Sequence, residues 1–289
     1  MSGLVAGIID VFADSPLTGN PLAVVQDADE LTDEQMRRIA GEFNQAETTF
    51  IMRSTRADWK LRSFTARGAE VFGAGHNALG AWLWLGEHGV LGQLTTPRTF
   101  QQEIGPDLLP IELVSIDGRI HGRMRQASLR LSEPLEDIAP LAAALGLDED
   151  DILVEPKPRP ADTGATHLIV RVRDAGRVDK AVPDAAKLLA VLDQTPAEGC
   201  YIYAFDPDAP ETAYARFFNP TVGLWEDSAT GTAGGPLAAY LAAEGLIEAG
   251  IVIEQGTKMG RPSFIRLRLT PEPEISGTGI VVLRGTLHP

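Results

Sequence analysis

Short stretches of alternating apolar and polar residues predict eight β-strands. They cover residues 4–12, 22–25, 48–51, 59–65, 118–125, 127–133, 263–270 and 279–287. Helices are expected over residues 33–42, where Thr32 is a suitable N-cap, and over residues 137–147 and 184–192. Residues 155–164 are rich in proline and charge and are expected to form an exposed loop.

Residues 62–89 and 216–245 carry the same pattern twice. Each stretch opens with Arg-x-Phe, crosses a glycine-rich turn and continues into an apolar helix that a glycine closes. Aligned from these final glycines, Gly75 coincides with Gly231. Because each helix is apolar nearly all round, it needs cover on every face, which a curled sheet would give. The repeat predicts two similar halves, with a functional site where they meet.

The composition is that of a globular protein with a strongly acidic surface. Of 289 residues, 40 are acidic and 25 are basic, which gives a formal net charge of −15. Such a surface repels nucleic-acid backbones and anionic membranes, so neither is an expected partner. No apolar run approaches the roughly 20 residues that cross a bilayer, and the N-terminus lacks the pattern of a secretory signal. A single cysteine, Cys200, allows no intramolecular disulfide and fits a cytoplasmic protein.

Three polar segments at tight turns are candidates for chemistry, and each also has a purely structural interpretation. Glu47 precedes an apolar strand and could be a solvated surface residue. His76 opens the first repeated helix, where it could cap the helix or, as a neutral imidazole at a helix N-terminus, move a proton. Asp227 or Ser228 precedes the second repeated helix and could be its N-cap.

The duplication favours the functional interpretation. Free N–H groups at the two helix N-termini could converge on one anion. A carboxylate substrate with Glu47, His76 and Asp227 around it would then occupy a proton-transfer site. Such a site suits isomerisation or epimerisation beside a carboxylate, without a cofactor. The sequence contains no P-loop, no complete dinucleotide fingerprint, no metal-ligand spacing and no pair of thiols.

Four segments resemble one known family. In chain order they are DVFADSPLTGNPLAVV, FNQAETTF, GAGHNALG and FNPTVGLWEDSATGTAGGPLAAYLAAEG. Their order and spacing resemble the phenazine-biosynthesis PhzF family, within the diaminopimelate-epimerase-like superfamily. The resemblance implies an α+β fold of two similar domains, each a curved, mainly antiparallel sheet wrapped around a central helix. We expect residues 1–117, joined by the C-terminal strand 276–289, to form one domain and residues 118–275 the other. The resemblance also implies a homodimer, with the active site between the domains.

The same resemblance implies roles for individual residues. Glu47 would be the catalytic acid/base, with His76 and Asp227 orienting the substrate and assisting proton movement. The substrate-binding residues would be Gly75, Asn77, Gly231, Thr232 and Gln126. In the phenazine enzyme of the family, the glutamate takes a proton from C3 of trans-2,3-dihydro-3-hydroxyanthranilate and returns it at C1.

The chain departs from the family pattern beside these residues. Asn77 and Ala78 stand where many members have Pro-Thr, and Thr232 stands where serine is common, which adds a methyl group to the pocket. Three functions remain open: an isomerase of the dihydrohydroxyanthranilate type, which needs no cofactor or metal, an epimerase or racemase of another small amino or hydroxy acid, and a non-catalytic binder. The retained Glu47 weighs against the binder, because a second negative charge does not help to hold a carboxylate.

Overall fold

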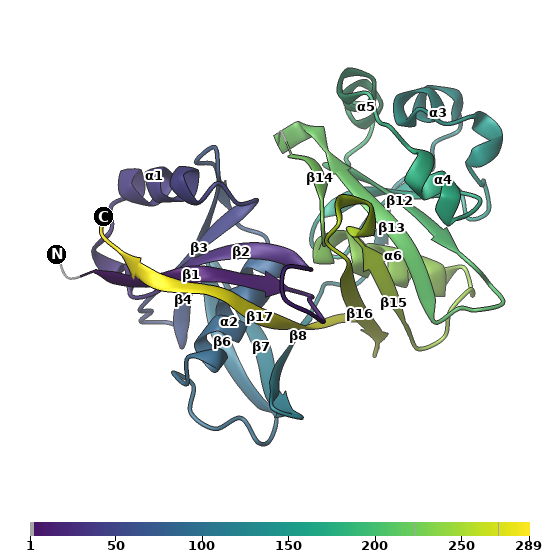
Figure 1. The fold of residues 1–289 in the computed structure, drawn as a ribbon. Coiled ribbons are helices and arrows are strands. Elements are labelled where there is room, and N and C mark those ends of the chain that lie inside the picture. Colours follow the sequence, from purple (N-terminus) through teal and green to yellow (C-terminus); the bar gives the residue numbers. More distant parts are fainter. Residues whose placement is uncertain (1–2, 223, 271) are drawn as a thin grey trace. The chain divides into compact units, whose positions relative to one another are not determined.

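The computed structural model describes residues 3–222, 224–270 and 272–289 (Figure 1). Strands and helices occur together along the chain, which confirms the α+β class. The chain divides into two compact units, a first unit of Met1–Arg125 with Ser276–Pro289 and a second unit of Gln126–Ile275. The domain boundary that we predicted after residue 117 stays a prediction.

The first unit is a mixed sheet with helices α1 (Asp33–Phe43) and α2 (His76–Glu87). Its strands are β1 (Leu4–Val11), β2 (Asn20–Val25), β3 (Glu47–Met52), β4 (Trp59–Thr65), β5 (Glu70–Val71), β6 (Arg98–Ile104), β7 (Asp107–Ile116), β8 (Arg119–Arg125) and the part of β17 (Pro273–Leu287) that follows residue 275. They pair in the order β17–β1–β2–β3–β4–β6–β7–β8. In this order β2–β3 and β4–β6 are parallel and the other pairs are antiparallel.

Helix α2 is the core of the first unit. Every residue from His76 to Leu85 is buried, and the helix contacts β1, β2, β3, β4 and β8. Trp82 and Trp84 are fully buried, and each indole N–H donates a hydrogen bond to a glutamine side chain. Burying one tryptophan contributes about 4–6 kcal/mol of transfer free energy, so these two side chains anchor the helix against the sheet.

The second unit has the same kind of architecture. Its strands are β9 (Arg130–Leu131), β10 (Arg159–Asp162), β11 (Thr166–Arg171), β12 (Gly199–Phe205), β13 (Thr212–Asn219), β14 (Leu224–Asp227), β15 (Gly250–Gln255) and β16 (Ser263–Leu269). They pair in the order β9–β10–β11–β12–β13–β15–β16, with β14 beside β13. The pairs β11–β12 and β13–β15 are parallel, and the others are antiparallel.

Helices cover the strands of the second unit. The buried helix α6 (Gly231–Ala243) contacts β10, β11, β15 and β16. A separate apolar cluster joins residues of α3 (Ala139–Leu145), α4 (Ala175–Lys180) and α5 (Ala185–Leu192) to side chains of β11 and β12. Short 3-10 turns complete the two units; they are Ala28–Glu30, Glu149–Asp151, Pro220–Val222 and Thr257–Met259.

Two local predictions illustrate where sequence patterns succeed and fail. Thr32 caps α1 through a reciprocal pair of hydrogen bonds with Gln35, as its position predicted. The exposed loop predicted over residues 155–164 is wrong for Arg159–Asp162, which forms β10 with Pro160 and Ala161 buried. Proline is tolerated here because its carbonyl alone is required: it accepts the N–H of Ser132.

Arg62, from the Arg-x-Phe of the first repeat, makes a bidentate ion pair inside the first unit. Its Nε and one terminal nitrogen donate to the two carboxylate oxygens of Glu70 at 2.7 and 2.8 Å. The guanidinium also lies over the ring of Phe64. The pair therefore joins β4 to β5 just before the glycine-rich turn.

Arg216, from the second repeat, makes the corresponding pair with Glu226. The two distances are 2.7 and 2.8 Å, and the side chains are only 7% and 11% exposed. The remaining terminal nitrogen donates to the carbonyls of Val178 and Ala181. Because both charges are largely desolvated, removal of either partner leaves the other poorly compensated.

The substitution Glu226→Gln is therefore expected to lower the free energy of unfolding by about 3 kcal/mol. The matched control is Glu136→Gln, which removes an ion pair with Lys157 whose two side chains are 79% and 53% exposed. That pair contributes less than about 1 kcal/mol. Urea-induced unfolding followed by tryptophan fluorescence measures both variants. Equal losses of unfolding free energy in the two variants would show that the Arg216–Glu226 pair stabilises the protein no more than the exposed pair does.

Candidate active site

Glu47 and His76 lie close together in the first unit. Glu47 is the first residue of β3, and His76 is the first residue of α2. The distance from His76 Nδ1 to Glu47 Oε2 is 3.6 Å. The side chain of Glu47 is 20% exposed and that of His76 is 9% exposed, so Glu47 is not a freely solvated surface residue.

The environment of Glu47 suits a group that exchanges protons near neutral pH. Burial raises the pKa of this carboxyl from 4.5 to about 7, because desolvation disfavours the charged form. Acid and base forms are then both well populated near neutrality. A general acid/base is most effective when its pKa lies near the working pH.

Asn77 holds the glycine-rich turn that precedes α2. Its Oδ1 accepts the N–H of Gly75 at 2.8 Å, and its Nδ2 donates to the carbonyl of Gly73 at 2.9 Å and to Ser63 Oγ at 3.1 Å. The residue is 3% exposed, and both ends of its amide are engaged. Asn77 therefore positions the turn through contacts that a proline could not make, while its substrate-binding role, like that of Gly75, stays a prediction.

The same hydrogen bonds connect α2 to β3. Thr49 Oγ1 lies 2.9 Å from Ser63 Oγ and 3.4 Å from the Asn77 carbonyl. Thr49 is two residues beyond Glu47 on β3, so this network joins the two elements that carry Glu47 and His76. Thr49 and Ser63 could not be identified from the sequence, because isolated hydroxyl residues inside a strand carry no signal.

Asp227 lies at the corresponding turn of the second unit. It is the last residue of β14 and is 8% exposed. One carboxylate oxygen accepts a hydrogen bond from Thr230 Oγ1 at 2.6 Å. Thr230 is the N-cap of α6, so neither Asp227 nor Ser228 holds the N-cap position considered above.

Gln255, at the end of β15, organises this turn. Its Nε2 donates to the Asp227 carbonyl at 2.8 Å and to Thr230 Oγ1 at 3.0 Å. Its Oε1 accepts from the Tyr201 hydroxyl at 2.8 Å and from the Thr230 N–H at 3.2 Å. Burial, with a smaller effect of the Asp227 charge, raises the pKa of Tyr201, which keeps that hydroxyl a donor. This contact could not be predicted from the sequence, because Gln255 is remote along the chain from Asp227.

Gln126 supports the first turn of α6 from another side. Its Oε1 accepts from Thr163 Oγ1 at 2.9 Å, and its Nε2 donates to the carbonyl of Gly231 at 3.0 Å. A Cβ atom at Gly235 would lie 1.4 Å from Gln126 Oε1, so only glycine allows this approach. The expected substrate contacts of Gln126 and Gly231 stay predictions.

Thr232 is the second residue of α6, and its hydroxyl oxygen lies 3.3 Å from His167 Nε2. His167 comes from β11 and is 3% exposed. The sequence offered no motif that would single out His167. The fold brings it to a predicted site residue.

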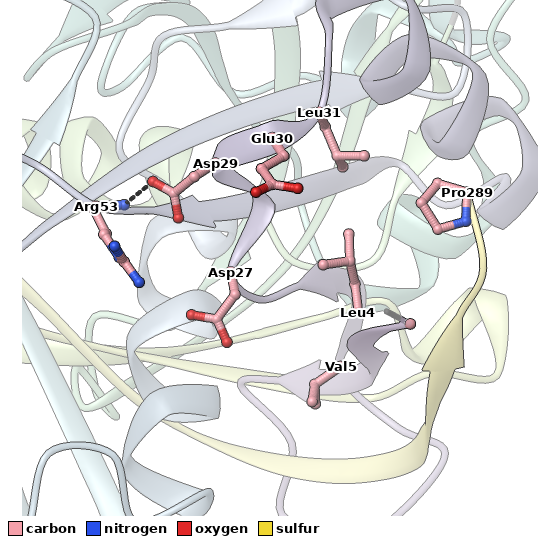
Figure 2. A pocket seen from close by; sticks show the side chains of 9 residues that line it. Leu4, Val5, Asp27, Asp29, Glu30, Leu31, Arg53 and Pro289 are labelled. Carbon is pink, nitrogen blue, oxygen red and sulfur yellow. Dashed lines mark hydrogen bonds between the residues drawn. The ribbon is translucent and has the colours of Figure 1, made fainter. Parts of the chain in front are cut away.

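A pocket in the first unit contains none of the predicted site residues (Figure 2). It is lined by Gly3, Leu4, Val5, Asp27, Asp29, Glu30, Leu31, Arg53 and Pro289.

Burial raises the pKa of the Cys200 thiol far above its ordinary value. Within residues 3–222, 224–270 and 272–289, no cluster of three or more His, Cys, Asp or Glu side chains could hold a metal ion. None of the helices in these ranges has the length and apolar character needed to span a bilayer.

The chain matches a known family over nearly its whole length. The family is described as phenazine biosynthesis-like protein (PhzC-PhzF), and the match covers residues 9–285. The chain belongs to this family. A trans-2,3-dihydro-3-hydroxyanthranilate isomerase of Pseudomonas chlororaphis is 33% identical over 97% of this chain and 98% of its own. The expected enzyme class, an isomerase, is confirmed by this membership.

Solved structures agree with the family. The crystal structure of a Bacillus anthracis phenazine biosynthesis protein of the PhzF family is 27% identical and covers all of both chains with a TM-score of 0.90. A hydroxyproline epimerase from Agrobacterium vitis, with bound trans-4-hydroxy-L-proline, has a TM-score of 0.66 over 99% of this chain and 94% of its own. Its identity is 14%, so the likeness shows the fold alone.

The raised pKa of Glu47 makes the stability of this PhzF-family protein depend on pH. Between 4.5 and about 7 the folded state holds a proton that the unfolded state has released, so stability falls as the pH rises through this window. The substitution Glu47→Gln removes this pH-dependent loss of stability. At about pH 8 the variant should be more stable than the wild type by about 3 kcal/mol, and at about pH 4 the difference should vanish.

Thermal unfolding of both proteins at the two pH values measures the effect. The control is Glu42→Gln, at an exposed position of α1. A difference for Glu47→Gln that does not change with pH would contradict a raised pKa.

Proposed function

We propose that this PhzF-family protein is a cofactor-independent isomerase that moves a proton on a small cyclic amino or hydroxy carboxylic acid. The proposed substrate is trans-2,3-dihydro-3-hydroxyanthranilate, within a phenazine-type pathway of the cytoplasm. One observation carries the proposal: the partly buried carboxyl of Glu47, with a pKa of about 7, lies 3.6 Å from His76 at the start of a buried helix.

The proposed reaction requires one group that first accepts and then donates a proton. Glu47, as carboxylate, takes the proton from C3; the C–H electron pair enters the conjugated system, and the protonated Glu47 returns the proton at C1. One C–H bond breaks and one forms, so the step needs neither an oxidant nor a reductant. A carboxyl with a pKa near neutrality supports both directions of transfer.

Further residues enter the proposal with defined tasks. His76, whose Nδ1 is directed to Glu47, orients the carboxyl and assists the proton movement. Asp227 is proposed to orient the substrate, as the family resemblance implies, and the backbone and side chains of Gly75, Asn77, Gly231, Thr232 and Gln126 are proposed to line the pocket. The contacts of Asn77 and Gln126 support roles in which they fix the turns that bear the other groups.

The relative from Pseudomonas chlororaphis supports the substrate proposal. At 33% identity over 97% of this chain and 98% of its own, the relative shares a family and an enzyme class with this protein. An epimerase of another small amino or hydroxy acid would use the same carboxyl. It would invert a stereocentre instead of moving a double bond. This difference in product distinguishes the epimerase from the isomerase in a solution assay.

The first test is proton NMR of the purified protein with trans-2,3-dihydro-3-hydroxyanthranilate in deuterated buffer. The wild type should consume the substrate, with loss of the C3–H signal. The Glu47→Gln variant should lose at least about 1000-fold in turnover, because it lacks the proton acceptor, whereas Glu42→Gln should keep full activity. Turnover by folded Glu47→Gln at the wild-type rate would refute the mechanism, and inversion of another acid with solvent exchange would favour the epimerase.

The pH dependence of the same reaction provides a second test. Proton abstraction requires ionised Glu47, so kcat/KM should rise tenfold per pH unit below the pKa of about 7 and level above it. Initial rates between about pH 5 and pH 9 measure this limb. A limb near the ordinary glutamate pKa of 4.5 would contradict the assignment.

We also propose that the two units are copies of one domain, and that the protein is a homodimer. The first claim is supported by the matching order of parallel and antiparallel pairs in the two units, and by the equivalent pairs Arg62–Glu70 and Arg216–Glu226. The dimer rests on the family resemblance, and analytical ultracentrifugation of the purified protein tests it.

A further inference from the structure

His167 controls a hydroxyl group at the start of α6. We infer that His167, as a neutral imidazole, donates its Nε2–H to Thr232 and so directs the Thr232 hydroxyl hydrogen outward, to an anionic group of the substrate. This makes His167 a positioning residue that favours a carboxylate ligand. The inference rests on the proposed substrate contact of Thr232 and deepens it.

The surroundings of the imidazole determine which nitrogen carries the hydrogen. Nε2 lies 3.3 Å from Thr232 Oγ1, whereas Nδ1 is buried without a hydrogen-bond partner among the described residues. A buried N–H without an acceptor is rarer and costlier than an unfilled lone pair. The hydrogen therefore belongs on Nε2, and the unfilled lone pair on Nδ1.

The protein also keeps this ring uncharged and fixed. The ring packs in a T-shaped arrangement with Phe217, with 4.9 Å between the ring centroids, and the side chain is 3% exposed. Burial lowers the pKa of His167 to about 4, against a smaller opposite effect of the Asp162 charge. At neutral pH the imidazole thus has a single N–H, and Thr232 receives it.

Thr232 is then left with one hydrogen to donate. A hydroxyl has one hydrogen and two lone pairs, and a lone pair is taken by the N–H of His167. No acceptor for the Thr232 hydroxyl occurs in the part of the chain that the structure describes, and Thr232 is partly exposed. Its position at the second residue of α6, beside the positive end of the helix dipole, favours an anion as acceptor.

The test compares ligand binding by three variants. Thr232→Val removes the hydroxyl at nearly constant volume, His167→Phe keeps an aromatic ring against Phe217 but removes the N–H, and the third combines both. The probes are anthranilate, which carries a carboxylate, and 2-aminobenzamide, its neutral counterpart, measured by calorimetric titration. Each single variant should bind anthranilate about tenfold more weakly, the loss expected for one hydrogen bond to a charged group, and 2-aminobenzamide should change little.

The double variant and the tautomer decide the inference. Because His167 acts through Thr232, the double variant should bind anthranilate no more weakly than Thr232→Val alone. Nitrogen-15 NMR of the wild type should show a neutral His167 protonated at Nε2. A hydrogen on Nδ1, additive losses in the double variant, or equal losses for both probes would each overturn the inference.

Failure of the proposed function is distinguishable from failure of this inference. If the wild type binds anthranilate with the expected variant pattern but does not turn over the proposed substrate, the function is wrong and the role of His167 stands. If turnover is normal and the losses of anthranilate affinity in His167→Phe and Thr232→Val are additive, the proposed function stands and the role of His167 is wrong.

Discussion

The structure depends on how two apolar helices begin inside the protein. The first N–H groups of a helix have no partner within it, and a buried polar group without a partner is costly. Helices α2 and α6 both begin with buried residues. In the first unit Asn77 fixes the turn before α2, and in the second unit Gln255 fixes the turn before α6. The polar residues that fix these turns also connect the elements that carry the candidate catalytic groups.

The carboxyls of this protein differ in pKa because their hydrogen-bond and charge partners differ. Glu103 accepts a hydrogen bond from Ser54 and lies beside Arg56, and these contacts hold its pKa below the ordinary value. Glu47 is desolvated beside a histidine, and its pKa rises to about 7. The same residue type is thus a permanent anion at one position and a proton-exchanging group at another. Its chemistry follows from the neighbours that the fold supplies.

The candidate site could be predicted in part from the sequence. Glu47, His76 and Asp227 stand in motifs at tight turns, where sequence pattern and family resemblance both carry information. The residues that position them left no such trace. Gln255 and His167 come from separate strands and reach their turns only because β15 and β11 lie against α6. A hydrogen bond between residues distant in the chain has no periodicity, so the sequence cannot reveal it.

The sequence by itself determined the apolar helices, about half of the strands and the repeated Arg-x-Phe unit, because these depend on local periodicity and on the burial of apolar side chains. It was wrong about residues 159–162, because the prolines of residues 155–164 indicate a loop, whereas the backbone forms a strand in which the Pro160 carbonyl accepts an N–H. Only the tertiary structure decided the proton affinity of Glu47, the engagement of Asn77 and the contact of His167 with Thr232. Desolvation and hydrogen bonding depend on which groups the fold brings within a few ångströms, and that information is absent from local sequence.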